Sequence, residues 1–273
     1  MELNKKDFMN ICQVNICNLS KVSQIPLEKY IFDHNIDILL VQETKMQLPP
    51  NLNNYLMEST PARGESLKEG GCAIYISNDI KQTTRLSDLE VDGLDIIWVL
   101  IKIGMQKMIL GTAYIQPDNT DHMERFTDSC RRAQEYAEGH GLDGIVMAGD
   151  FNARDSWWND RTTNKNGDIL KGFIEKSKCS IISPGRDTFS CTNKEGKVGG
   201  SVIDLIICSE SLSNYFECCT VDETPILRTG APGRGHWPVL SKIRVNGAED
   251  DRKKRSPLCT AGKMQTGING RLL

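Results

Sequence analysis

Polar side chains that can hold a metal ion or move a proton follow several apolar, strand-like runs of this sequence. The clearest case is the run 145–148, which stops at Gly149 and is followed by Asp150 and Asn152. Residues two apart on an extended backbone point to the same side, so this carboxylate and this carboxamide would share a face. Layered α/β proteins place their active sites at such strand ends. Taken alone, the pattern also fits an ordinary turn after a strand.

The same feature recurs at five other positions. Asn15 follows the first strand-like run, Glu43 follows the second, and Tyr114 ends a hairpin. Asp204 lies inside an otherwise apolar strand, where a charge is costly unless it is paired or bound to a metal. His236 begins the last strand. Each has a plain structural interpretation as a polar or aromatic residue near a strand end, although Asp204 would still need a buried partner.

These residue types indicate one kind of chemistry when they are taken together. Carboxylate and amide oxygens suit Mg²⁺ or Mn²⁺ rather than zinc. A histidine and a tyrosine beside such an ion fit in-line attack on a phosphodiester, in which the metal neutralises charge, a carboxylate orients water and donors hold the phosphoryl oxygens.

The elements that must position these side chains follow from the apolar periodicity. Strands are predicted at 9–14, 36–41, 72–76, 96–103, 108–114, 145–148, 188–190, 202–208 and 237–245, and helices at 22–33, at 121–138 and around 170–174. Asp121 and Glu124 resemble a capping box, and Gly139 stands where a C-cap belongs. Hairpins mixed with helices, in a chain too long for one small sheet, predict two packed sheets covered by helices.

Composition narrows the class of protein. The chain has 273 residues and a formal net charge of −3, which argues against a strongly basic nucleic-acid coat protein. Its apolar runs are too short or too interrupted to span a bilayer, and the first residues lack the apolar core of a signal peptide. The irregularly spaced cysteines are therefore interpreted as reduced thiols in a nuclear or cytoplasmic protein that is not secreted.

Six features, taken in order, resemble the endonuclease/exonuclease/phosphatase superfamily: Asn15, the Gln-Glu-Thr-Lys block 42–45, Tyr114, the Gly-Asp-Phe-Asn-Ala block 149–153, the Ser-Val-Ile-Asp block 201–204, and His236. Over roughly 9–245 the chain is most similar to the apurinic-like endonuclease domain of insect-type non-LTR retrotransposons, a similarity that includes Trp157-Trp158 and the following Arg161 to Asn164. Each short motif alone is weak, whereas the ordered set is strong.

The resemblance implies a fold, and with it the limits of a domain. The expected fold is a deoxyribonuclease-I-like α/β protein, a four-layer sandwich of two mixed, mainly antiparallel β-sheets flanked by helices. This domain would occupy 1–246, and the charged and polar stretch 247–273 would be a tail or linker.

The resemblance also implies roles for residues. Glu43 with Asn15 would hold Mg²⁺, with Mn²⁺ as an alternative. Asp150 would orient or deprotonate the attacking water, and Asn152 with Tyr114 would hold the scissile phosphate. Two further residues complete the implied catalytic set, Asp204 as support and His236 as the group that stabilises the transition state. Thr188 and Ser201 would contact DNA or support the site. Lys194 and Lys197 would lie on a hairpin that probes the minor groove.

One position departs from the superfamily pattern. The family ends in Ser-Asp-His, where the Asp is expected to orient the histidine, but this chain reads Arg234-Gly235-His236. Loss of an orienting carboxylate can cost on the order of 10⁴-fold in rate, judged from the serine-protease template. The sequence therefore predicts a nuclease that is either weakened or supported by another acid, for which Asp222 and Glu223 are candidates.

The implied activity is Mg²⁺-dependent nicking of double-stranded DNA by a monomer, leaving a 3′-hydroxyl that primes reverse transcription, with a reverse transcriptase domain in the parent polyprotein and no membrane. Two alternatives stay open: a non-catalytic remnant that binds nucleic acid or protein, and another phosphoesterase of the superfamily, such as an apurinic repair endonuclease.

Overall fold

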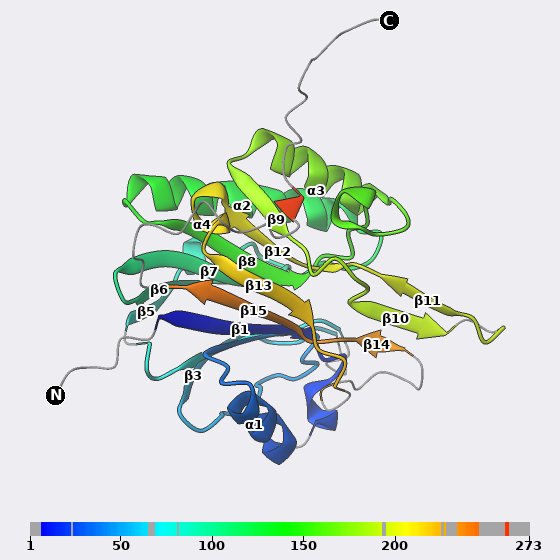
Figure 1. Cartoon of the computed structure of the whole chain (residues 1–273), viewed down its shortest axis with the longest axis horizontal. Coiled ribbons are helices and arrows are strands. Elements are labelled where there is room, and N and C mark those ends of the chain that lie inside the picture. Colours follow the sequence, from blue (N-terminus) through cyan, green and yellow to red (C-terminus); the bar gives the residue numbers. More distant parts are fainter. Residues whose placement is uncertain are drawn as a thin grey trace, which may run out of the picture.

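Two β-sheets pack face to face in this protein, and helices cover the outer face of each (Figure 1). The structure is a computed structural model that describes residues 7–22, 24–64, 69–80, 82–192, 195–224, 227, 234–245 and 260–261. The four layers are, in order, α1, the first sheet, the second sheet, and α2 with α3. The four-layer α/β sandwich expected from the sequence is therefore confirmed.

The first sheet has the strand order β13-β15-β1-β2-β4-β3. Its strands are β1 (Phe8–Asn15), β2 (Ile38–Gln42), β3 (Tyr55–Thr60), β4 (Cys72–Ser77), β13 (Phe216–Val221) and β15 (Val239–Arg244). Only β1 and β2 run parallel among the pairs of this sheet, with Asn15 paired to Gln42 at their carboxyl ends.

The second sheet has the order β16-β9-β12-β8-β7-β6-β5. It contains β5 (Gln82–Arg85), β6 (Asp95–Ile103), β7 (Gln106–Tyr114), β8 (Gly144–Asp150), β9 (Cys179–Ile182), β12 (Asp204–Ser209) and the two-residue β16 (Thr260–Ala261). β7 and β8 are parallel and pair Tyr114 with Asp150. A small third sheet joins β10 (Phe189–Thr192) to β11 (Val198–Ser201) and β14 (Gly235–His236).

The helices are α1 (Gln24–Asp33), α2 (Thr120–Gly139), α3 (Lys165–Lys176) and α4 (Glu210–Ser213), with short 3-10 turns η1 (Leu19–Lys21), η2 (Ser87–Leu89) and η3 (Ser156–Trp158). The expected caps of α2 are wrong by a few residues. Asn119 is the N-cap, and its side chain accepts the N–H of His122 at 3.0 Å. Gly139 is still helical, and Gly141 provides the left-handed residue that ends helices.

The core forms three apolar layers. Ile11, Leu40, Leu110 and Val146 pack between the two sheets. A second cluster packs the other face of the second sheet against α2 and α3, and a third packs the first sheet against α1. Neighbouring residues of the central strands therefore face different layers, which is why these strands read as continuous apolar runs.

The strands that the sequence pattern missed are β3, β5, β9, β11, β13 and the two-residue β14 and β16. They are short or lie toward sheet edges, where half-exposed and polar residues break the alternation. Over the part of the chain that is described, no helix is both long and apolar enough to cross a membrane.

Candidate active site

The strand ends that carry the polar residues meet at one edge of the sandwich. Pairing places Asp150 beside Tyr114 on one side and beside Asp204 on the other. Asn15 of the first sheet then reaches across to Asp150 of the second. Six positions spread over more than 200 residues of sequence thus form one cluster: Asn15, Glu43, Tyr114, Asp150, Asp204 and His236.

Asn15 joins two carboxylates of this cluster. Its Nδ2 donates to Glu43 Oε1 at 2.9 Å and to Asp150 Oδ2 at 2.8 Å. The Asn15 Oδ1 accepts the backbone N–H of Cys17 at 2.9 Å. The amide nitrogen therefore faces the site, and the oxygen that a metal ion would need is engaged by the backbone.

Asp150 is held from two sides. Its Oδ1 accepts the backbone N–H of Asn152 at 3.0 Å, and its Oδ2 lies 3.7 Å from His236 Nε2. Asn152 in turn donates its Nδ2 to the carbonyl of Ile115 at 3.0 Å. The expectation that Asp150 and Asn152 share one face of an extended backbone needs correction, because Asn152 adopts a left-handed conformation with φ of 45°.

Gly149 allows these strands to approach closely. A Cβ at this position would lie 2.0 Å from the carbonyl oxygen of Ala113 on the neighbouring β7. The glycine before Asp150 is therefore needed for packing of the backbone, and it does not end the strand as the sequence suggested, because β8 continues to Asp150.

A carboxylate contacts His236, as one of the two sequence-based alternatives expected, but it belongs to a different acid from those suggested. Its Nδ1 lies 2.9 Å from Asp204 Oδ2 and 3.2 Å from Asp204 Oδ1. Neither acid suggested as a substitute is engaged there, because Asp222 accepts from Tyr30 at 2.6 Å and Glu223 pairs with Arg186. Asp204 is therefore the carboxylate that contacts His236.

The backbone conformation at position 235 explains why a glycine is present there. Its φ is 148°, in the range that residues with a side chain rarely adopt. It is buried in β14 and pairs with Ser190 of β10. An aspartate at this position would strain the segment that carries His236.

Thr188 supports the backbone at Asp204. Its Oγ1 accepts the backbone N–H groups of Ile203 at 3.2 Å and Asp204 at 3.1 Å, and it is fully buried. Ser201 is buried as well. Of the two roles expected for these residues, this arrangement fits support of the site rather than direct DNA contact.

Gln13 is a site residue that the sequence reasoning missed. Its Nε2 donates to Asp204 Oδ1 at 3.0 Å and to Gln42 Oε1 at 2.9 Å, and Gln42 donates to Thr112 Oγ1 at 2.6 Å. These buried side chains connect the two sheets beneath the cluster. The sequence could have indicated Gln13 as a site residue, because it lies two residues before Asn15 and therefore shares its face of β1.

Burial and charge shift the proton affinities in this cluster. Burial, together with the charge of Asp204, raises the pKa of Asp150 to about 7 despite the opposing effect of His236. Burial alone would lower the pKa of His236, but the Asp204 and Asp150 carboxylates raise it to about 9. Burial and the nearby acids also raise the pKa of Tyr114, whose hydroxyl is hydrogen-bonded to Glu43.

Glu43 is the acid of the cluster whose charged form is stabilised. Burial would raise its pKa, but hydrogen bonds from Asn15 and Lys45 lower it below the usual value. Lys45 Nζ lies 2.5 Å from Glu43 Oε2. Glu43 and Lys45 both have positive φ, as do Cys17 and Asn152. Non-glycine residues in this conformation are uncommon and concentrate at functional sites.

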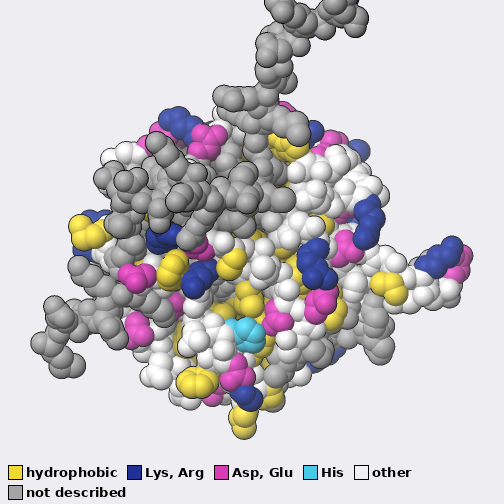
Figure 2. Space-filling model, in the orientation of Figure 1, with side chains coloured by type: hydrophobic (Ala, Val, Ile, Leu, Met, Phe, Trp, Pro, Cys, Tyr) yellow, Lys and Arg dark blue, Asp and Glu magenta, His cyan; other side chains and the backbone are white. Residues whose placement is uncertain are grey.

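The hairpin of β10 and β11 projects away from the sandwich (Figure 1). Lys197 is exposed near its tip, 3.9 Å from Glu195, while Lys194 lies outside the described residues. On the face shown in Figure 2, lysine and arginine side chains lie among acidic ones and do not form a single basic field.

The donor set fits a hard divalent cation. Among the described residues, Asp150, Asp204 and His236 each offer a ligand atom within 4.8 Å of the others. Glu43 adds a third carboxylate, and Lys45 and His236 are the basic groups in contact with these acids. Gathered buried carboxylates of this kind suit Mg²⁺ or Mn²⁺.

Comparison with known proteins agrees with this geometry. Residues 108–227 match the family model described as endonuclease-reverse transcriptase. A probable RNA-directed DNA polymerase from transposon BS of Drosophila melanogaster is 25% identical over 186 residues, covering 66% of this chain and 19% of that protein. The RNA-directed DNA polymerase from mobile element jockey of the same species is 24% identical over 170 residues, covering 61% of this chain and 17% of that protein. The chain thus spans less than a fifth of these relatives.

Solved structures share the fold. The endonuclease domain of TRAS1, a telomere-specific non-LTR retrotransposon, superposes with a TM-score of 0.68 at 20% identity, covering 88% of this chain and 100% of that one. The AP endonuclease LMAP from Leishmania major gives 0.72 at 14% identity, with 89% of each chain covered. The fold is that of the deoxyribonuclease-I-like endonucleases. Within that class, the resemblance to the endonuclease domains of non-LTR retrotransposons is confirmed.

Proposed function

We propose that this chain is a Mg²⁺-dependent endonuclease domain that nicks double-stranded DNA. The observation that carries the proposal is the buried cluster in which Asp150 lies between Asn15 of one sheet and the Asp204–His236 pair. A histidine held by one acid beside a second acid of raised pKa is suited to proton transfer in a water-excluded site.

Each residue of the cluster has a separate role in the proposed reaction. Glu43, in contact with Asn15, would hold Mg²⁺, which when bound neutralises charge on the scissile phosphate. Asp150 orients the attacking water and accepts its proton. Asp204 fixes the Nδ1 of His236, so that Nε2 is left to hydrogen-bond a phosphoryl oxygen.

The overall reaction is hydrolysis of one phosphodiester. Water attacks phosphorus, and the bond between phosphorus and the 3′ oxygen breaks, leaving a 3′-hydroxyl and a 5′-phosphate. Tyr114 and Asn152 hold the phosphate during this step. We infer that the 3′-hydroxyl primes reverse transcription, because the curated relatives are RNA-directed DNA polymerases several times longer than this chain.

The test is nicking of supercoiled plasmid with Mg²⁺, with and without EDTA. The wild-type protein should convert supercoiled to open-circular DNA only with metal. The Asp150→Asn variant should lose roughly 10² to 10⁴-fold of this rate, while Asp128→Asn on the exposed face of α2 serves as the matched control. Extension of the nick by a DNA polymerase without prior phosphatase treatment checks for the 3′-hydroxyl.

The alternative is a binding remnant without catalysis. Gly235 was the feature that favoured it, and the Asp204–His236 contact removes that argument. A well-folded wild-type protein that binds duplex DNA yet gives no metal-dependent nicking would establish the remnant and refute the nuclease.

A further inference from the structure

Arg234 lies near the candidate catalytic cluster, to which the ring of Phe189 links it. It is exposed, and it precedes the buried His236 by two residues. The ring of Phe189 links them: it packs against the His236 ring at 4.7 Å between centroids, and the Arg234 guanidinium lies 5.9 Å from the Phe189 centroid.

The side chains of the cluster include more acidic groups than basic ones. Glu43, Asp150 and Asp204 are acidic, and the basic groups that contact them are His236 and Lys45. A DNA strand would bring further negative charge to this already acidic site. Within the part of the chain that the structure describes, no carboxylate forms an ion pair with Arg234, so its guanidinium is available to a ligand.

We propose that Arg234 binds a backbone phosphate of the DNA substrate next to the scissile one. Two residues of an extended strand span about 6.6 Å. Successive phosphates of one DNA strand are separated by a comparable distance through space, because each one rises about 3.4 Å along the helix axis and also turns around it. A strand whose phosphate sits at His236 therefore presents a neighbouring phosphate to Arg234. The planar guanidinium suits a phosphate through paired hydrogen bonds, and Phe189 restricts its orientation.

This inference rests on the proposed function and deepens it, because it assigns substrate binding to a residue outside the catalytic cluster. The test compares Arg234→Gln with Lys242→Gln. Lys242 is a matched control, since its Nζ stacks 4.1 Å from the Phe8 ring at the end of β1 opposite to Asn15. Both variants lose one positive charge over a phenylalanine ring.

Binding of a 30-base-pair duplex is measured in EDTA over a series of salt concentrations, and plasmid nicking is measured with Mg²⁺. Arg234→Gln should weaken binding about threefold to tenfold and reduce the slope of log K against log salt by about 0.9, the value for one phosphate. In nicking, KM should rise while kcat changes less than about twofold. Arg234→Lys should keep the wild-type slope, and Lys242→Gln should match wild type in both assays.

An Arg234→Gln variant with the slope and KM of wild type would overturn the inference and leave the nuclease proposal standing. A loss of kcat with unchanged binding would also overturn it, because that result would mean that Arg234 acts through His236. Wild-type protein that neither binds the duplex at low salt nor nicks plasmid with Mg²⁺ would refute both proposals.

Discussion

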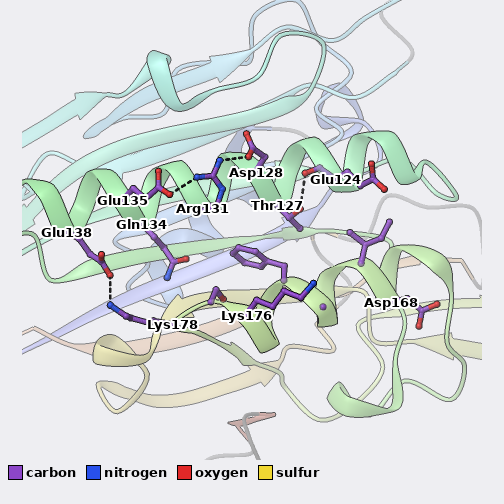
Figure 3. Close-up of a pocket in the computed structure, with 14 residues that line it drawn as sticks. Glu124, Thr127, Asp128, Arg131, Gln134, Glu135, Glu138, Asp168, Lys176 and Lys178 are labelled. Atoms are coloured by element: carbon purple, nitrogen blue, oxygen red, sulfur yellow. Dashed lines mark hydrogen bonds and ion pairs between the residues drawn. The ribbon is translucent and has the colours of Figure 1, made fainter.

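Charged side chains gather at two places in this protein, of which one is exposed to solvent and the other is buried. A cavity of about 710 Å³ lies between α2 and α3, where acidic and basic side chains line an open groove (Figure 3). Arg131 there bridges Asp128 at 2.6 Å and Glu135 at 2.5 Å, and both Arg131 and Glu135 are more than half exposed. At the strand ends, by contrast, the Asp150 and Asp204 side chains are 1% and 0% exposed.

The difference shows why the groove between α2 and α3 is not the candidate active site. Exposed ion pairs are screened by water and contribute about 0–1 kcal/mol each. Buried acids interact strongly and shift each other's pKa, which is what proton transfer requires. The groove is therefore a solvated surface of two helices, whereas the small polar cluster is suited to the proposed chemistry. Four predictions test this comparison.

The largest effect is expected from Asp204→Asn. The amide cannot stabilise a protonated His236 or select its tautomer in the same way, so nicking should fall by roughly 10² to 10⁴-fold, by analogy with the acid of a serine-protease triad. The matched control is Asp222→Asn, which removes the acid paired with Tyr30 and should leave kcat within about twofold. A full loss in Asp222→Asn with activity retained in Asp204→Asn would reverse the assignment of the orienting acid.

Gly235→Asp should reduce activity rather than raise it. The carboxylate is not needed, since Asp204 already holds His236, and a side chain at φ of 148° strains the backbone by on the order of 1–3 kcal/mol. Thermal unfolding and plasmid nicking should both decline, and Gly235→Ala should show the same loss of stability. Faster nicking by Gly235→Asp would contradict this account and restore the idea of a site disabled at one position.

The metal-free protein should lose stability as pH rises. Asp150 and His236 both bind their protons more tightly in the folded state, because their pKa values are raised to about 7 and about 9. Their favourable contribution is present at low pH and is lost from about pH 4 to 7 for Asp150 and from about pH 6.5 to 9 for His236.

Urea unfolding in EDTA across this range checks the pH prediction. The free energy of unfolding should decline by a few kcal/mol, since one pKa unit corresponds to about 1.4 kcal/mol. The Asp150→Asn variant should show a weaker decline between pH 4 and 7. A free energy of unfolding that increases across the whole range would contradict the coupling of these buried groups.

The smallest effect is expected in the groove. Arg131→Ala removes two exposed ion pairs of α2 and should change the free energy of unfolding by less than about 1 kcal/mol. Plasmid nicking should equal that of wild type. A loss of nicking in this variant would show that the groove affects catalysis at the site or contacts the substrate.

Much of the fold was predictable because its central strands have distinctive patterns. The apolar runs that became β2, β6, β7 and β8 are buried on both faces, and α2 carries an apolar stripe at helical spacing. The edge strands β3 and β13 escaped prediction because their residues are only partly buried. Their pairing is set by neighbours distant in sequence, which no local window contains.

The sequence by itself determined which groups are available for chemistry: acids, an amide, a tyrosine and a histidine, each at or near a strand end. It also determined the glycine before Asp150, which the close approach of β7 requires. It could not show which acid meets which base, because that depends on how strands from two sheets are brought together.

Only the tertiary structure decided that Asp204 contacts His236, which lies 32 residues later in the chain. Only the tertiary structure likewise decided that Gln13, on the other sheet and 191 residues before Asp204, donates a hydrogen bond to that acid. The physical reason is that buried charges must find partners wherever the packed sheets place them. Neighbours in sequence, such as Arg234 and Gly235, are free to take other roles.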